Sequence, residues 1–258
     1  MIVILAGLLP AIILIYHIYK ADKLQPEPPK QLLRAVYYGV GSIFVSMLFS
    51  IPFRQMGFFS EQYTSFTGAL QQAFWGAAVP EELAKLIMLV LVIRKNPYFD
   101  EMMDGIVYAV CVGMGFAGFE NVLYVTEAGN DWMSVSVTRA LLSVPCHYYC
   151  AVFMGYFFAK FWFLKEHRLR NLFWTLAAPV ITHCLYDFIC MYFSVTSFPG
   201  SSTLMAILLI ISCTQFLKWS KRRIAEHLDT DERSSYSSYQ KFERSIMDKY
   251  DKSDNPYA

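Results

Sequence analysis

The amino-acid sequence predicts an all-α integral membrane protein with about seven transmembrane helices. Of its 258 residues, 55% are hydrophobic and 17% are aromatic, and the mean hydropathy is +0.34. The apolar residues form long blocks, instead of the alternating or amphipathic patterns that are typical of soluble domains. A membrane-spanning helix needs roughly 20 mostly apolar residues, and the chain contains a block of this kind repeatedly.

The apolar blocks predict where each helix crosses the membrane. We expect spans at residues 1–19, 32–52, 68–93, 104–126, 135–164, 171–193 and 199–218. The first block has no basic stretch before it and no small-residue cleavage site after it, which favours a retained helix over a signal peptide. Residues 1–220 are therefore expected to form one membrane domain. Residues 221–258 are expected to form a polar cytoplasmic tail that is flexible or weakly helical.

The connections between the spans alternate in positive charge. The second connection contains only Arg54, and the fourth and sixth contain neither lysine nor arginine. The others and the segment after the last span are rich in basic residues: Lys20, Lys23, Lys30, Arg34, Arg94, Lys95, Lys160, Lys165, Arg168, Arg170, Lys218, Lys221, Arg222 and Arg223. Because basic loops stay in the cytoplasm, the N-terminus is predicted outside and the C-terminus in the cytoplasm.

Charge and cysteine content exclude other classes of protein. The net charge of +1 is spread over loops and tail, so nothing predicts nucleic-acid binding. Membrane lipid is the expected surrounding. The six cysteines lie inside apolar blocks without a CxxC pair, as is typical of small packing residues: Cys111, Cys146, Cys150, Cys184, Cys190 and Cys213.

Polar and ionisable side chains occur deep inside the predicted spans, where each charge costs roughly 2.5–3.5 kcal/mol by insertion scales. At a rise of about 1.5 Å per residue, one group falls near mid-depth: Glu81, Glu82, His147 and His183. A second group falls in the outer half, with Arg139 nearest the outer surface: Glu120, Asn121, Asp187 and Arg139. These similar depths predict one shared polar cavity that opens toward the outside.

Local spacing supports this cavity. Glu81 and Glu82 precede Lys85 by four and three residues, so both carboxylates can reach one ammonium on a helix face. His183 precedes Asp187 by four residues, a spacing at which a carboxylate can orient an imidazole. Prolines near the site remove backbone donors and can open local room for water or substrate.

These residue types can hydrolyse a peptide bond. A carboxylate can accept a proton from water and pass it to the leaving amine, and histidine or asparagine can stabilise the oxyanion. The predicted catalytic residues are Glu81, Glu82, Glu120, Asn121, His147 and His183, supported by Lys85, Arg139 and Asp187. We expect no metal cofactor. However, two histidines and a glutamate also match a His₂Glu zinc site, and spacing alone does not separate the two mechanisms.

Several motifs resemble those of the PrsW family. They are Pro80-Glu81-Glu82-Leu83-Ala84-Lys85, Asp104-Gly105-Ile106-Val107-Tyr108, Gly115-Phe116-Ala117-Gly118-Phe119-Glu120-Asn121-Val122-Leu123-Tyr124, and Asp22 followed by Pro26-Glu27-Pro28. Arg139, His147 and His183 fall where the family has its Arg and His motifs. More distantly, the chain is similar to CAAX prenyl endopeptidases and bacteriocin-processing membrane proteases. It departs from their pattern with Lys85 in place of arginine, Glu120 in place of histidine, and Asp187 after His183.

The resemblance implies an intramembrane protease in the plasma membrane of a bacterium. Its implied substrate is a single-span membrane anti-sigma factor, cut on the extracytoplasmic side to release a sigma factor under envelope stress. Two other classes remain open: a proton- or ion-coupled transporter that uses the buried carboxylates, and a non-catalytic scaffold that acts through its tail. The sequence shows no internal repeat of the kind common in transporters, and it gives no oligomeric state.

Overall fold

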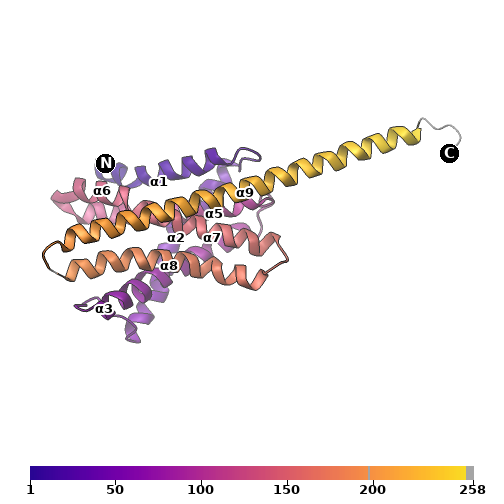
Figure 1. The fold of residues 1–258 in the computed structure, drawn as a ribbon. Helices are drawn as coiled ribbons and strands as arrows, with labels where there is room; N and C mark the ends of the chain where they lie inside the picture. The colour runs from indigo at the N-terminus through magenta and orange to yellow at the C-terminus, as the bar shows by residue number, and fades with distance from the viewer. Residues whose placement is uncertain (197, 254–258) are drawn as a thin grey trace.

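The computed structural model describes residues 1–196 and 198–253, and within these ranges the chain is helical with no strand. The long helices are α1 (Ile2–Ala21), α2 (Pro29–Gln55), α5 (Met102–Glu127), α7 (Ser143–Phe163), α8 (Arg168–Val195) and α9 (Ser201–Ser253). The shorter elements are α3 (Phe66–Gln71), η1 (Gln72–Ala78), α4 (Val79–Ile93), η2 (Gly129–Asp131) and α6 (Trp132–Leu141). They form one bundle from which the end of α9 projects (Figure 1).

The predicted fold class is confirmed. Six helical segments of the described chain have the length and composition to cross a membrane, and α6 with α7 makes one of them. The remaining predicted span, residues 68–93, is helical but divided into α3, η1 and α4, and α4 has only 15 residues. The count of about seven spans therefore corresponds to six full-length segments and one divided segment. The orientation of the termini stays a prediction of the loop charges.

The divided segment changes its helical geometry immediately before the paired glutamates. Over η1 the backbone is a π-helix, and the Val79 N–H bonds to the Phe74 carbonyl five residues back. Pro80 follows, has no N–H, and its ring would clash with the carbonyl four residues earlier in a regular helix. The wider π turn relieves that clash, and such turns often occur at functional sites. It sets the rotation with which Glu81 and Glu82 leave the helix.

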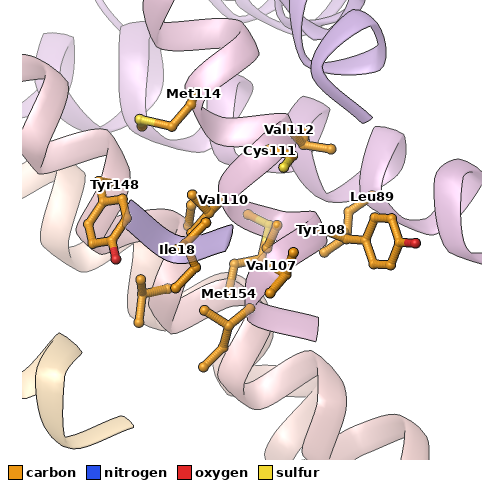
Figure 2. Close-up of a cluster of buried hydrophobic side chains, with 14 of the residues drawn as sticks. Ile18, Leu89, Val107, Tyr108, Val110, Cys111, Val112, Met114, Tyr148 and Met154 are labelled. Carbon is orange, nitrogen blue, oxygen red and sulfur yellow. The ribbon is translucent and has the colours of Figure 1, made fainter. Parts of the chain in front are cut away.

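Helix α5 is the centre of the bundle, and buried residues occur along most of its length. A Cβ at Gly39 of α2 would lie 2.0 Å from the Val112 carbonyl oxygen, and one at Gly115 would lie 2.2 Å from that of Val36. Only glycine therefore permits this close crossing of α2 and α5. Figure 2 shows side chains of the surrounding core, including Ile18, Leu89, Val107, Tyr108, Val110, Cys111, Val112, Met114, Tyr148 and Met154.

The structure of the polar tail differs from the predicted flexible or weakly helical segment. It continues α9 without interruption to Ser253, so the boundary expected after residue 220 lies inside one helix. Ile224, His227 and Asp231 are 8%, 1% and 5% exposed. Their spacing of three and four residues places them on one helix face. The tail sequence is polar because its other faces contact water, while this face packs against the bundle.

Candidate active site

Lys85 is at the centre of the polar residues predicted inside the membrane. Its Nζ donates to Glu82 Oε1 at 2.8 Å and to Glu81 Oε2 at 3.4 Å. It also lies 3.2 Å from His147 Nδ1 on α7 and 3.9 Å from the centre of the Phe116 ring on α5. The i+3 and i+4 spacing expected from the sequence is thus realised, and the ammonium links α4 to two other helices.

The two adjacent glutamates occupy different environments. Glu82 is fully buried, and its Oε1 contacts both Lys85 and His183 Nδ1, each at 2.8 Å. The Glu81 side chain is 16% exposed, and its Oε2 lies 3.9 Å from His183 Nε2. Glu82 is therefore fixed by close contacts, whereas Glu81 has weaker contacts and can be reached from outside the protein.

A second group of charges joins α5, α6 and α7 beside these residues. Glu120 Oε2 accepts from Arg139 Nη2 at 2.6 Å and lies 3.1 Å from His147 Nε2. Arg139 Nε donates to Asn121 Oδ1 at 2.9 Å, and its guanidinium stacks 3.9 Å from the centre of the Tyr124 ring. Glu120 thus orients His147, and Arg139 is held in turn by Asn121 and Tyr124.

Asn121 lies behind the site. It is fully buried, and its Nδ2 donates to the Gly7 carbonyl of α1 at 2.8 Å. Its Oδ1 is occupied by Arg139. In this geometry the Asn121 amide holds Arg139 and α1 in position and is shielded from solvent.

The side chains of the site differ in their exposure. Glu81, Glu120, Arg139 and Asp187 are 16–19% exposed, whereas Lys85, His147 and His183 are 4% exposed. Glu120, Arg139 and Asp187 are three of the four residues that the sequence predicts in the outer half of the membrane, and the fourth, Asn121, is buried. Asp187 Oδ2 also lies 3.3 Å from His183 Nε2, as the four-residue spacing predicted.

The site balances most of its own charge. Each carboxylate has a cationic or imidazole neighbour within 4 Å: Lys85 for Glu81 and Glu82, Arg139 for Glu120, and His183 for Asp187. Buried ions are tolerated only when they are paired and hydrogen-bonded. The structure therefore brings every predicted site residue into one network, with Asn121 at its rear.

The donor set of a zinc site is present within this network. One atom each of Glu81, His147 and His183 lies within 4.8 Å of the others, and His₂Glu is a common catalytic zinc set. His147 Nε2 contacts the Glu120 carboxylate, and His183 Nδ1 contacts the Glu82 carboxylate. The second ring nitrogen of a metal-bound histidine commonly makes such a contact. Glu82 Oε2 is buried without a partner. These residues fit zinc, but the Lys85 ammonium lies among the same donors and competes with it.

Sequence reasoning missed two aromatic contributions. Phe116 covers the Lys85 ammonium, and Tyr124 covers the Arg139 guanidinium. Both residues stand in the motif block that contains Glu120, so their nearness in sequence was visible although their partners were not. Cation–π contact on a buried cation replaces part of its lost hydration.

Fold and site together define the class: a helical, multi-pass membrane protein with a buried site of glutamates and histidines. A family model described as "PrsW family intramembrane metalloprotease" matches residues 27–213. The chain therefore belongs to the PrsW family of intramembrane proteases, as its motifs suggested.

Relatives in several bacteria agree with this assignment. "Protease PrsW" of Bacillus subtilis is 33% identical over 188 residues, which is 72% of this chain and 82% of the relative. "Protease PrsW" of Geobacillus kaustophilus is 32% identical over 186 residues, 72% of this chain and 78% of the relative. The Clostridioides difficile protein of the same name is 29% identical over 190 residues, 72% of this chain and 78% of the relative. No solved structure matches significantly. The chain is thus a multi-pass protease of the bacterial cell membrane.

Proposed function

We propose that this protease cuts a membrane-anchored anti-sigma factor near its extracytoplasmic side, using a water molecule activated by Glu81. The observation that carries the proposal is the difference between the paired glutamates. Glu81 has the accessible carboxylate, while Glu82 is enclosed by Lys85 and His183. A general base must reach water and substrate, and of the two only Glu81 has exposed surface.

The chemical step conserves every atom and proton. The Glu81 carboxylate accepts a proton from water as the water oxygen forms a bond to the substrate carbonyl carbon. The carbonyl oxygen becomes an oxyanion, and collapse of the tetrahedral intermediate breaks the C–N bond. Protonated Glu81 returns its proton to the departing amine, leaving a new carboxyl end and a new amino end.

The neighbouring residues have distinct roles in this step. His183 Nε2, which lies 3.9 Å from Glu81 Oε2, is placed to donate to the oxyanion, whereas His147 contacts Lys85 through Nδ1 and Glu120 through Nε2 and positions both. Glu120 and Asp187 orient these imidazoles. Lys85 and Glu82 fix the position and charge of the Glu81 carboxylate. Asn121 is a positioning residue for Arg139.

Two arguments support an extracytoplasmic cut in an anti-sigma factor. The accessible residues of the site are mainly those in the predicted outer half of the bundle, so a peptide would approach from that side. The resemblance to the PrsW family supplies the class of substrate. The family assignment also favours protease over the transporter and scaffold alternatives.

Co-expression with a membrane-anchored anti-sigma factor from the same genome tests the proposal. We expect the wild-type chain to produce a shortened factor, and Glu81→Gln to accumulate in the membrane without producing it. Glu127→Gln is the matched control, because Glu127 is an exposed glutamate at the end of α5. Equal cleavage by wild type and Glu81→Gln would exclude Glu81 as the base. Cleavage of other membrane peptides but not of the anti-sigma factor would refute the proposed class of substrate.

A zinc-dependent version of the same reaction is the second candidate. The description of the family and the close donors of Glu81, His147 and His183 favour it. Zinc bound there would lower the pKa of a coordinated water and polarise the substrate carbonyl. Elemental analysis of the purified chain separates the two versions. About one zinc per chain, lost in His147→Ala with His183→Ala, supports zinc dependence; metal-free protein that cleaves in the presence of chelator supports the metal-free version.

A further inference from the structure

A second group of buried carboxylates lies at the opposite end of the bundle from the N-terminus, where α1 ends and α5 begins (Figure 1). Asp22 follows α1, and Glu101 and Asp104 form the capping box of α5. One oxygen from each of these three residues lies within 4.8 Å of the others. The residues are 2%, 8% and 0% exposed. They come from segments about 80 residues apart in the sequence and meet only in the folded chain.

Several oxygens of this group are buried without a hydrogen-bond partner. They are both carboxylate oxygens of Asp22 and Oδ1 of Asp104. The other Asp104 oxygen accepts from the backbone N–H groups of Asp100 and Glu101, at 2.9 and 2.8 Å. Gln25 Nε2 donates to Glu101 Oε2 at 3.1 Å. Hydrogen bonds therefore hold Glu101 and Asp104 in place, while both oxygens of Asp22 and one oxygen of Asp104 remain without a partner.

The surroundings of these three residues add further negative charge. Asp231 of α9 accepts from the N–H groups of Met102 and Met103, at 2.9 and 2.8 Å, and so caps α5. Glu27 accepts from the Tyr108 hydroxyl. Among the residues that the structure describes, none makes an ion pair with Asp22, Glu101 or Asp104. Unpaired buried carboxylates are costly, so this group needs a positive partner.

We propose that Asp22, Glu101 and Asp104 bind a hard divalent cation of the Mg²⁺, Ca²⁺ or Mn²⁺ class. The ligands are all carboxylate oxygens, which these cations prefer, and no histidine or cysteine that would favour zinc belongs to the group. The loop charges predict that this end of the bundle faces the cytoplasm, where Mg²⁺ is available. The cation joins the connection after α1 to the start of α5. Through Asp231 it also reinforces the docking of α9.

Protons are the competing partner. Burial and the nearby Asp231 raise the pKa of Asp22 to about 6, and the same two causes raise the pKa of Glu101 to about 7. Without a cation, these carboxyls take up protons close to neutral pH. Proton uptake and cation binding therefore oppose each other, and pH distinguishes them.

Thermal unfolding of the full chain, purified in detergent and stripped with chelator, tests the proposal at pH 8. Addition of MgCl₂, CaCl₂ or MnCl₂ is expected to raise Tm by about 5–10 °C at concentrations far above Kd, since ligands that bind only the folded state stabilise it. Electron paramagnetic resonance spectra of the samples with MnCl₂ should show one tightly bound Mn²⁺ per chain. No rise in Tm with any of the three cations, and no bound Mn²⁺, would overturn the proposal.

Variants locate the bound cation. Asp22→Asn should lose the rise in Tm and the bound Mn²⁺, yet fold, because the substitution removes a buried charge without changing size. Glu232→Gln is the matched control, since Glu232 is exposed on α9 beside Asp231. Glu81→Gln should keep the effect, which separates this cation from any metal at the active site. A rise in Tm that persists in Asp22→Asn would place the cation elsewhere and refute the site.

Discussion

The active-site network and the carboxylate group at the start of α5 differ in how their buried negative charges are compensated. In the active site, Lys85, Arg139 and two histidines lie among the buried carboxylates. At the start of α5, Asp22, Glu101 and Asp104 lie together, and no basic side chain in the described part of the chain makes an ion pair with them. The active site supplies most of its own counter-charge, whereas the other group needs protons or a cation from outside.

The position of each region explains the difference. The active site lies within the apolar part of the helices, where the chain must supply its own counter-charges. The carboxylate group lies at the ends of α1 and α5, where the apolar segments stop. Ions and protons from water can reach such a place. The stability of the active site should therefore depend on its own basic residues. The stability of the carboxylate group should depend on pH and on the cations in solution.

The largest effect is expected for the active-site base. Glu81→Gln should reduce cleavage by about 10³-fold or more, because general-base catalysis contributes about 10²–10⁴-fold and the neutral amide cannot take up the proton. Quantitative blotting of cleaved factor against membrane-bound enzyme measures the loss. Tm should change little, since Glu81 is partly exposed and weakly paired. A large fall in Tm together with lost cleavage would give Glu81 a structural role.

The next effect concerns stability. Lys85→Met leaves Glu81 and Glu82 without their shared ammonium, and breaking a buried ion pair from one side costs about 3–5 kcal/mol. Urea or thermal unfolding in detergent should therefore show a strongly destabilised protein. Lys165→Met, at an exposed position between α7 and α8, is the control and should unfold like wild type. Combining Lys85→Met with Glu82→Gln should restore part of the loss, and a double variant as unstable as Lys85→Met would contradict the charge-pairing argument.

A smaller effect on catalysis is expected from the residue that orients His147. Glu120→Gln weakens the contacts to His147 and Arg139, and misplacement of a catalytic group by about 1 Å can cost about 10²-fold in rate. The turnover number should fall more than the apparent affinity for the substrate changes. Glu127→Gln, two helical turns further along α5, should leave both quantities unchanged. Full activity of Glu120→Gln would mean that His147 needs no orientation by this carboxylate.

The smallest effect is a pH dependence of stability at the carboxylate group. Burial raises the pKa of Asp22 to about 6 and the pKa of Glu101 to about 7. Protonation of these carboxyl groups therefore stabilises the fold fully at pH values below their pKa in the unfolded chain, and this stabilisation is lost as the pH rises through about 6–7. In chelator, Tm should therefore rise by about 3–5 °C between pH 8 and pH 5.5. The other acidic groups that face Asp22 or Glu101 are Glu27, Asp100, Asp104 and Asp231.

Two comparisons check that pH effect. Asp22→Asn should show a flatter dependence of Tm on pH than wild type, since one titrating carboxyl is gone. Saturating Mg²⁺ should raise Tm most at pH 8 and least at pH 5.5, because protons displace the cation. An equal Mg²⁺ effect at both values would contradict the competition.

Much of the fold and the active site followed from local sequence. Long apolar blocks predicted the ends of α1, α2, α5 and α8 to within a few residues, but not the division of residues 68–93 or the extension of α9 to Ser253. The depth of Glu81, Glu120, His147 and His183 predicted their meeting, because a charge inside an apolar helix must face another polar group. The polar tail was harder to interpret, since the three residues that dock it, Ile224, His227 and Asp231, alternate with the charged residues Glu226 and Asp229 and do not form an apolar block.

The sequence by itself determined the membrane class, the helices and the set of ionisable residues that must share the interior, because the cost of a charge in lipid leaves few alternatives. Only the tertiary structure decided that Glu82 is enclosed while Glu81 is accessible, since the π-helix before Pro80 sets their rotation. It alone also decided that Asp22 meets Glu101 and Asp104. Contacts between residues about 80 positions apart depend on how α1 and α5 pack, and no local spacing encodes that packing.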